Sequence, residues 1–359
     1  MRGVPRPLHS CKRRASAKIP AMPLSKIAFI RSTVLFILLG MAALLVIGGA
    51  APSRADVMVG ARTSATEAPN WKPTLLAFEA SIGRPLAIDS DYNNWAAFPD
   101  PPRIAWDLRN GRLPMQSWNV QFQSSDPNVC ATAAAINAGT YDTQLDRQAA
   151  ALKALGGTIL VRFNDEMTGA QEHTCFTGFP ISQNVPLAGQ EFIAAWRHVV
   201  GRFRAAGATN VKWVWAPGAG AFLQGIWRLF YPGDAWVDWI AVDDYNIVDT
   251  PTSFGDDPGI TEFYAATAPL GKPLMISENA AFNDPTLNPD AQTMWVQTAR
   301  AFIKSHPAIV AYVYWDCFSP NNPPPPPPYH GSGYILNGLG LAAFRALAND
   351  PYFMAPGGP

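Results

Sequence analysis

The sequence predicts an α/β protein built as a (β/α)8 TIM barrel, and three observations support this fold. Short apolar, β-rich segments alternate with longer segments of helical period from Val57 to the C-terminus, which favours parallel β-α-β units over a β-sandwich. The predicted strands number eight, as a closed barrel of this class requires. Residues 56–359 also suit one domain of this kind, which commonly takes roughly 250 residues or more.

Each strand is expected at a short apolar segment that is rich in branched side chains. The expected strands are Val57–Ala61, Leu86–Asp89, Pro114–Trp118, Thr158–Phe163, Val211–Ala216, Val237–Val242, Pro273–Ser277 and Ile309–Trp315. Helices are expected where apolar residues recur at helical spacing, at Tyr141–Leu155, Gln190–Ala206, Pro289–Ser305 and Leu339–Ala348. The segment from Asn321 to Gly333 contains six consecutive prolines and predicts a stiff loop after the last strand. A linker to a second domain is disfavoured because only one helix follows it.

The N-terminal segment has the composition of an export signal. Basic residues precede an uncharged apolar run from Thr33 to Ala51, and Ser53-Arg54-Ala55 follows with small residues at the positions that a signal peptidase reads. The run is also close to the ~18–20 residues of a membrane-spanning helix, so a retained anchor is the alternative. Residues 1–55 are therefore expected to be a signal peptide or membrane anchor, with residues 33–51 as the possible tether. The barrel domain, 56–359, is expected to be secreted or held in the cell envelope.

Composition excludes several classes of partner. The net charge is +0 and no basic stripe is present, so nucleic acid is not expected as a partner. The sequence lacks a Cys-x-x-Cys motif and its histidines are scattered, so no metal or other cofactor is expected. Outside the cytoplasm a disulfide can persist; Cys130 with Cys175 is preferred, although Cys317 leaves two other pairings open. The chain is expected to act as a monomer.

Two strand ends carry a glutamate, and catalytic groups of such barrels lie at the C-terminal ends of strands. Glu166 follows the fourth expected strand and Glu278 the seventh. Alternation of side chains predicts that Arg162, Asn164 and Glu166 share one face, and that Leu274, Ile276 and Glu278 share another. Either glutamate alone would be read as a cap or an ion-pair partner.

Together they predict glycoside hydrolysis, in which one carboxyl protonates the leaving oxygen and the other attacks the anomeric carbon. A separation of roughly 5–5.5 Å between the carboxyls would give retention of configuration. The two groups must hold different protonation states, and Arg162 is a candidate for keeping Glu278 ionised.

At these residues the sequence resembles glycoside hydrolase family 26; the resemblance spans most of residues 56–359 and is weaker before Pro114. The motifs that carry the resemblance are Arg162-Phe-Asn-Asp-Glu166-Met-Thr-Gly169, Trp213-Val-Trp215-Ala-Pro217, the run from Tyr231-Pro-Gly-Asp to Asp-Asp-Tyr245-Asn246, and Lys272-Pro-Leu-Met-Ile-Ser-Glu278. The resemblance implies a retaining enzyme that cuts β-linked polysaccharide internally, with mannan, mixed-linkage glucan or xylan as substrates.

The resemblance also implies roles for single residues. Glu166 takes the place of the acid/base and Glu278 that of the nucleophile. Tyr245 takes the place of a tyrosine that hydrogen-bonds the nucleophile, and Trp315 could form an aromatic floor beneath the sugar at the cleavage point.

Departures from the family pattern lie beside the sugar site. Asp165 stands where the family has histidine, Thr168 stands where it has asparagine, and the loop 171–178 lacks the tryptophans of the mannanases. These changes make mannan a less certain substrate. The extra carboxylate of Asp165 either raises the pKa of the neighbouring acid or is a tethered surface group.

The remaining candidate residues each have two interpretations. Trp118 and Trp215 are sugar platforms or core, and Trp213 is interpreted as core. Asp243 and Asn246 bind hydroxyls or cap the loop after strand six, while loop histidines His173 and His330 are interpreted as solvated. The expected substrate-binding residues are thus Arg162, Asp165, Trp118, Trp215, Tyr245 and Trp315.

Two other functions compete with hydrolysis by this glutamate pair. A catalytically silent polysaccharide-binding barrel is disfavoured because binding alone does not need two glutamates. A metal-dependent hydrolase is disfavoured because no His and Asp ligands cluster at strand ends.

Overall fold

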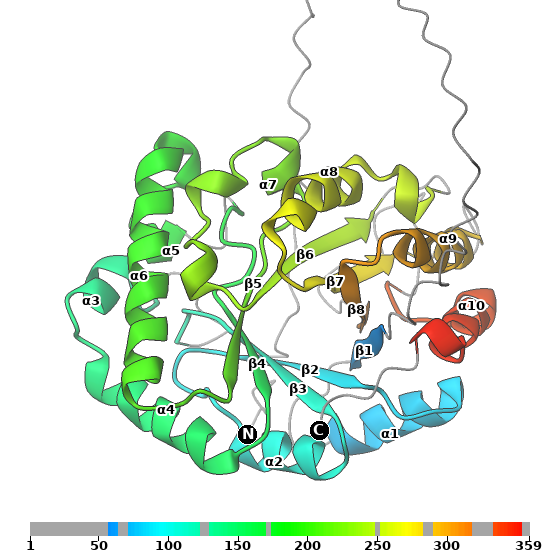
Figure 1. Ribbon diagram of the computed structural model, residues 1–359, viewed down its shortest axis with the longest axis horizontal. Helices are drawn as coiled ribbons and strands as arrows, with labels where there is room; N and C mark the ends of the chain where they lie inside the picture. The colour runs from blue at the N-terminus through cyan, green and yellow to red at the C-terminus, as the bar shows by residue number, and fades with distance from the viewer. Residues whose placement is uncertain are drawn as a thin grey trace, which may run out of the picture.

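The computed structural model describes residues 57–63, 71–122, 129–169, 174–247, 252–282, 290–317 and 333–353. Eight parallel strands form a closed barrel in chain order, and helices surround it (Figure 1). The strands are β1 (Met58–Thr63), β2 (Ile88–Asn93), β3 (Leu113–Trp118), β4 (Ile159–Phe163), β5 (Val211–Trp215), β6 (Trp239–Asn246), β7 (Leu274–Ala281) and β8 (Ile309–Asp316). The predicted (β/α)8 fold is confirmed.

The barrel closes through β1 and β8, which pair in parallel from Met58 with Ala311 to Thr63 with Asp316. Five strands run further than the sequence predicted, and the longest extensions are in β2, β6 and β7, which continue to Asn93, Asn246 and Ala281. The added residues of β2 and β6 are mostly polar, as in Ser-Asp-Tyr-Asn of β2, and polar runs of this kind resemble turn signals. In the barrel these residues are nevertheless mostly buried at the strand ends, where the candidate site lies.

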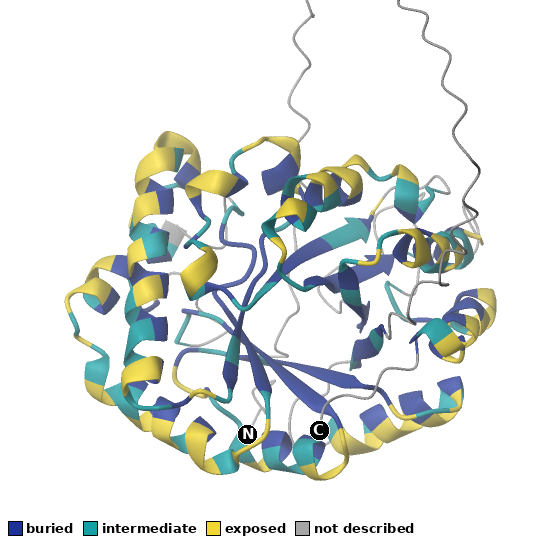
Figure 2. Cartoon of the chain, in the orientation of Figure 1, coloured by how far each residue is buried: buried dark blue, intermediate teal, exposed yellow. Residues whose placement is uncertain are grey.

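Two apolar layers hold the barrel together. The interior is filled by a small cluster made of Ile88, Leu113, Met115, Leu160, Val214, Ala216, Ala241, Met275, Ala311 and Val313. A larger layer lies between the strands and the helices, and Figure 2 shows the buried strands inside helices that expose only their outer faces. Gly60 is required for close packing within the barrel, because a Cβ there would lie 2.7 Å from Cβ of Ile88.

The longer helices cover the outside of the barrel. They are α1 (Trp71–Ile82), α2 (Pro101–Arg109), α4 (Asp142–Leu155), α6 (Val185–Ala205), α8 (Pro258–Thr267), α9 (Ala291–Ser305) and α10 (Gly338–Ala348), with short helices α3 (Ala133–Asn137), α5 (Thr174–Thr177) and α7 (Gly220–Leu223). Helix α6 begins earlier than the predicted Gln190, because Asn184 caps it by accepting a hydrogen bond from the Leu187 amide at 3.2 Å. Pro186 then occupies its first turn, where it costs no backbone hydrogen bond.

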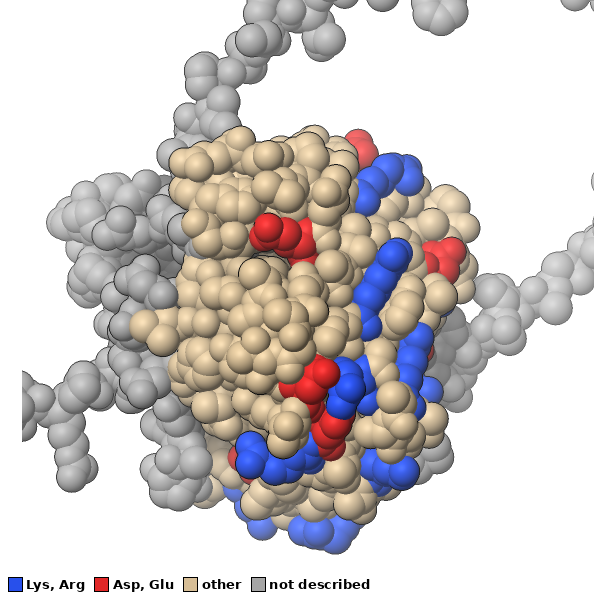
Figure 3. Space-filling model, turned by 90° about the vertical axis from the view of Figure 1, so that its left-hand side faces the viewer, with Lys and Arg blue, Asp and Glu red and all other residues tan. Residues whose placement is uncertain are grey.

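The face formed by α4 and α6 carries an ion-pair network. Arg202 of α6 pairs with Asp142 and Asp146 of α4, and His198 lies 2.6 Å from Asp142. Figure 3 shows Lys and Arg side chains in a band on this side of the molecule, with acidic side chains among them. Both signs are therefore present on the face, and such exposed pairs contribute little to stability singly.

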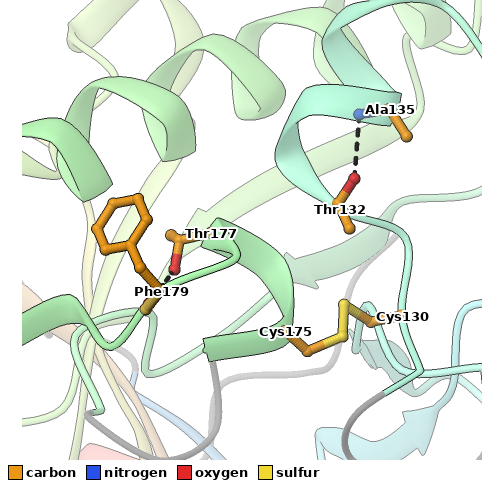
Figure 4. Close-up of a disulfide and its surroundings, with 6 residues drawn as sticks. All are labelled: Cys130, Thr132, Ala135, Cys175, Thr177 and Phe179. Carbon is orange, nitrogen blue, oxygen red and sulfur yellow. Dashed lines mark hydrogen bonds between the residues drawn. A yellow bond between two sulfur atoms is a disulfide. The ribbon is translucent and has the colours of Figure 1, made fainter.

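The disulfide predicted between Cys130 and Cys175 is confirmed, with the two Cα atoms 6.0 Å apart (Figure 4). It joins the segment after β3 to α5, which follows β4, so it braces two connections at the C-terminal end of the barrel. Thr132 caps α3 beside it by accepting from the Ala135 amide at 3.2 Å. Cys317, after β8, is buried and takes no part in this disulfide.

Within the described ranges, no helix is both long enough and apolar enough to cross a membrane. The predicted signal or anchor, residues 1–55, lies outside the described residues. Residues 321–332 of the predicted proline loop also lie outside them. His173 and His330 lie outside them too.

Candidate active site

A buried arginine lies at the centre of the polar cluster at the C-terminal ends of the strands. Arg162 of β4 is 0% exposed, and its guanidinium contacts side chains from several neighbouring strands. Nε donates to Ser117 of β3 at 2.9 Å, and Nη1 donates to both oxygens of Asp243 of β6 at 3.0 and 3.1 Å. Nη2 donates to Glu278 of β7 and lies 3.2 Å from the Tyr92 hydroxyl of β2. One cation therefore organises the carboxylates of the site.

Glu278 is held by three donors. Its Oε1 accepts hydrogen bonds from Arg162 and from the Tyr92 hydroxyl, and its Oε2 accepts one from the Tyr245 hydroxyl at 2.5 Å. The residue is only 2% exposed. Hydrogen bonds and an adjacent positive charge favour the ionised form of a carboxyl group, so this arrangement suits a carboxylate that must stay charged and fixed in orientation.

The orientation of Glu278 depends on an irregularity that the sequence did not indicate. The expectation that Glu278 shares a face with Leu274 and Ile276 is wrong, because both residues pack in the outer layer under the helices. Val242 pairs with Ile276 but Asp243 pairs with Glu278, so Ser277 is an extra residue in β7. This bulge changes the alternation and turns Glu278 toward the interior.

The extra residue has a bond of its own. Ser277 Oγ donates to Asp243 Oδ1 at 2.5 Å, which fixes the carboxylate that faces Arg162. Asp243 is 3% exposed, and its side chain is an ion-pair partner of Arg162 instead of a loop cap.

Glu166 is presented by a strained backbone. Asn164 and Glu166 have φ of 48° and 51°, in the left-handed region that costs a residue with a side chain about 1–2 kcal/mol. The expected alternation from Arg162 through Asn164 to Glu166 therefore fails beyond the end of β4. The amide of Glu166 bonds the Ala216 carbonyl at 2.8 Å, which holds the turn against β5.

The side chain of Glu166 lies against Gly218, where an added Cβ would be 3.9 Å from its Cγ. Gly218 forms a β-bridge with Asp243, the ion-pair partner of Arg162. Glu166 is 7% exposed. Both predicted catalytic glutamates thus lie around the Arg162–Asp243 pair.

Burial and charge shift the titration of the groups around the glutamates. Burial raises the pKa of Asp243 well above its usual range, although Arg162 opposes this and Glu278 and Glu166 reinforce it. Burial alone would lower the pKa of Arg162, but Asp243 and Glu278 raise it above its usual value. Burial, followed by the charge of Glu278, raises the pKa of Tyr92. The arginine stays charged and this phenol stays a donor at neutral pH.

Asp165 also faces the arginine, with Oδ2 3.5 Å from Nη2 of Arg162, and it is 8% exposed. It is therefore not a surface group. Oxygen atoms of Asp165, Asp243 and Glu278 lie within 4.8 Å of one another, a grouping that could hold a metal ion. Arg162 contacts all three carboxylates, so a guanidinium already supplies the positive charge there.

An aromatic wall adjoins Glu278 and its partner Tyr245. Trp315 of β8 is 7% exposed and meets Tyr245 edge to face, with ring centroids 5.9 Å apart. Tyr334 lies 5.6 Å from Trp315 and 5.3 Å from Tyr245. The structure thus brings Trp315 and Tyr245 together and adds Tyr334.

Trp118 and Trp215 do not reach the site, and their interpretation as sugar platforms is wrong. Both are 0% exposed. Trp118 stacks between Trp95 and Phe98, with centroids 4.7 and 4.3 Å away, and Trp215 donates from Nε1 to the Phe230 carbonyl at 3.1 Å. Both belong to the outer layer under the helices. Trp213 lies in the same layer, which confirms its interpretation as core.

Sequence reasoning missed Tyr92, the second phenol on Glu278. Two guanidinium groups lie near its ring, with Cζ of Arg62 5.1 Å and Cζ of Arg162 5.6 Å from the ring centroid. Tyr92 falls in the polar end of β2, beyond the predicted end at Asp89. The only signal was an alternation of Ile88, Ser90 and Tyr92 on one face of an extended strand.

Comparison with known proteins relates the chain to polysaccharide-degrading enzymes. No family model matches it. A segment of 214 residues is 32% identical to Endoglucanase H of Acetivibrio thermocellus, covering 57% of this chain and 22% of that protein. The chain therefore spans less than a quarter of the relative that it matches.

Solved structures show the same fold. The Bacillus subtilis mannanase BCman has a TM-score of 0.59 at 16% identity, covering 85% of this chain and 88% of that one. The endo-β-1,4-mannanase of family 26 from Bacillus sp. JAMB-750 has a TM-score of 0.60 at 15% identity, covering 83% and 87%. The family 26 β-mannanase BoMan26A from Bacteroides ovatus gives 0.56 at 14% identity, covering 84% and 90%. The predicted resemblance to glycoside hydrolase family 26 is confirmed.

Proposed function

We propose that this barrel, which resembles glycoside hydrolase family 26 in sequence and fold, is a retaining endo-β-glycosidase acting on a β-linked polysaccharide. The observation that carries the proposal is the setting of Glu278. It is a buried carboxylate held by Arg162, Tyr92 and Tyr245 at the C-terminal end of the barrel. Glu166 projects from the end of the fourth strand toward the same cluster. A fixed anionic nucleophile and a second carboxyl group are what double displacement needs.

In the first step Glu166 donates its proton to the glycosidic oxygen while a carboxylate oxygen of Glu278 forms a bond to the anomeric carbon. The bond from that carbon to the leaving oxygen breaks, and the leaving chain departs as an alcohol. In the second step the Glu166 carboxylate takes a proton from water, whose oxygen attacks the anomeric carbon and releases Glu278. Two inversions give net retention of configuration.

The residues around Glu278 fix its geometry. Arg162 and Tyr92 share one carboxylate oxygen and Tyr245 binds the other, so rotation of the carboxylate is restricted. Such fixed donors need no reorganisation as the charge of the nucleophile changes. Arg162 also balances the neighbouring carboxylate of Asp243.

The substrate class follows from two features. The structural neighbours named above are mannanases and the sequence relative is an endoglucanase, which supports a β-linked hexose polymer. Asp165 and Thr168 depart from the family pattern beside the acid/base. These departures favour mixed-linkage glucan or an exopolysaccharide over mannan. Trp315 would form the floor beneath the sugar ring at the cleavage point.

The setting in the cell is part of the proposal. The basic, apolar and small-residue order of residues 1–55 supports export. The disulfide between Cys130 and Cys175 is consistent with an oxidising compartment. The enzyme would then act as a monomer on polysaccharide outside the cytoplasm, secreted or held in the envelope.

The test is sugar release by the purified protein from β-mannan, mixed-linkage glucan, xylan and bacterial exopolysaccharides. Glu278→Gln should abolish release, and Glu262→Gln, at an exposed position on α8, should leave it unchanged. NMR of the first product should show a retained anomer. Equal release by the parent and Glu278→Gln would refute the assignment of the nucleophile. Binding of the protein to one polymer without release of sugar would instead support a catalytically silent polysaccharide-binding barrel.

A further inference from the structure

Tyr334 lies beside the nucleophile although it is far from it in sequence. Its ring centroid is 5.3 Å from that of Tyr245 and 5.6 Å from that of Trp315. Tyr245 in turn donates from its hydroxyl to Glu278. Tyr334 therefore contacts the side chain that holds the nucleophile, and it is itself half-buried.

Two buried side chains fix the backbone that carries Tyr334. Asp316 of β8 accepts a hydrogen bond from the Leu336 amide at 2.7 Å. Gln292 of α9 donates to the Ile335 carbonyl at 3.0 Å and to the Ala281 carbonyl of β7 at 3.3 Å. Asp316 is 7% exposed and Gln292 is 2% exposed. The residues directly after Tyr334 are thus attached to β7, β8 and α9, so its position is set by the barrel.

The ring of Tyr245 needs such support. Tyr245 lies near the end of β6 and is itself partly exposed, so its ring is not enclosed by the core. Trp315 contacts it at an interplanar angle of 87° and Tyr334 contacts it at 52°. Trp315 and Tyr334 also contact each other, so the three rings form one cluster, and aromatic contacts of this kind have a preferred geometry. Removing Tyr334 would take away one side of the cluster and free the Tyr245 ring to turn.

We propose that Tyr334 is a positioning residue for the nucleophile, acting through the Tyr245 ring to keep its hydroxyl on Glu278. This inference rests on the proposed function, since it assumes that Glu278 attacks the sugar. It assigns Tyr334 no contact with the reacting atoms. The anchored segment that follows the proline run thereby becomes part of the catalytic apparatus.

The test compares Tyr334→Ala and Tyr334→Phe with the parent on the polymer that the parent cuts. Tyr334→Ala should lower kcat by about tenfold or more with KM little changed, as expected when an interaction made in the transition state is lost. Tyr334→Phe keeps the ring and should restore kcat to within about threefold of the parent. Tyr264→Ala is the matched control, because Tyr264 is also half-buried and packs on the His306 and Phe302 rings at the other end of the barrel.

A crystal structure of Tyr334→Ala gives a second readout that needs no substrate. The Tyr245 hydroxyl should leave Glu278, whereas an unchanged contact near the 2.5 Å of the parent would overturn the proposal. Unchanged kcat in Tyr334→Ala, with Glu278→Gln inactive, would overturn the positioning role and leave the proposed function intact. Equal activity of Glu278→Gln and the parent would refute the proposed function itself.

Discussion

Arg162 donates from a single nitrogen to both carboxylate oxygens of Asp243, at 3.0 and 3.1 Å, inside a barrel mouth where neither side chain is exposed to solvent. The same guanidinium also binds Glu278 and lies 3.5 Å from Asp165. One positive charge therefore balances carboxylates from three strand ends. Since an isolated buried charge is costly, the arginine is needed for the fold of the site as well as for its chemistry.

Replacing this arginine should damage stability and activity together. Arg162→Met leaves Asp243 and Glu278 without a buried cation, and breaking a buried ion pair from one side costs about 3–5 kcal/mol. We expect a loss of this size in the free energy of unfolding in urea, and no sugar release. Arg202→Met, at an exposed ion pair on α6, is the control and should unfold like the parent. A stable Arg162→Met protein would show that the carboxylates hold protons and do not need the cation.

The two phenols on Glu278 predict a kinetic effect without loss of the fold. Tyr245→Phe and Tyr92→Phe each remove one hydrogen bond to the carboxylate, and a hydrogen bond to a charged group contributes about 1.5–3 kcal/mol. The expected fall in kcat is about ten- to a hundredfold for each variant, with a retained anomer in the product. Because both act on one group, the double variant should depart from additivity. A fall only in the Tyr245 variant would mean that Tyr92 serves Arg162 instead of the nucleophile.

Trp118 tests the distinction between core and sugar platform. It is 0% exposed and stacks between Trp95 and Phe98, so Trp118→Ala should destabilise the protein by about 3–5 kcal/mol. At a temperature where the variant remains folded, KM should be unchanged. Trp315→Ala should show the opposite behaviour, with a higher KM and a smaller loss of stability than Trp118→Ala. A higher KM in the Trp118 variant at full folding would restore its role as a platform.

The disulfide should contribute mainly to stability. Cys130 and Cys175 are separated by 45 residues, and closing a loop of that size stabilises a fold by roughly 4 kcal/mol in the chain-entropy model. We expect Cys130→Ala/Cys175→Ala to lose an amount of this order in chemical unfolding. Cys317→Ala removes a cysteine outside the bridge and should change the stability little by comparison. Equal stability of the double variant and the parent would indicate that the bridge is not formed in the purified protein.

The sequence predicted the barrel and the place of the two glutamates at strand ends because each rests on a local pattern. Strand period and helix period are readable within a few residues, and all eight strands were expected within a few residues of their observed positions. Glu166 and Glu278 each lie within three residues of an apolar run, so their place at the C-terminal mouth follows from the topology alone.

The features that could not be predicted from the sequence depend on how neighbouring strands pair and pack. The bulge at Ser277 is a relation between β6 and β7, and nothing in either strand alone indicates it. Trp215 was misinterpreted for the same reason: alternation grouped it with Trp213, but only the packed barrel shows that this face lies under the helices. Tyr92 was missed because buried polar residues at the end of β2 look like a turn until their partners are known.

The pH dependence of stability should contain a contribution from Asp316, which anchors the segment after Tyr334. Burial raises the pKa of Asp316 from 3.8 to about 7, although the hydrogen bond from the Leu336 amide opposes this. In the native state Asp316 therefore keeps its proton between these two values, whereas the unfolded chain has already lost it. Its contribution is fully present below pH 3.8 and is lost as the pH rises to about 7.

Over that window the loss amounts to roughly 4 kcal/mol, since one pKa unit corresponds to about 1.4 kcal/mol. Asp316→Asn removes the titration. The free energy of unfolding of this variant in urea, relative to that of the parent, should therefore increase from pH 5 to pH 8. Asp350→Asn is the control, because the pKa of Asp350 is shifted in the opposite direction. Burial acts to raise this pKa, but hydrogen bonds from Lys304, the Tyr352 amide and Arg300 lower it to about 2. That variant should lose the same stability at both pH values, because Asp350 is ionised at both. A constant difference between Asp316→Asn and the parent would mean that Asp316 does not keep its proton in the folded protein, and that its bond to Leu336 is made by a carboxylate throughout.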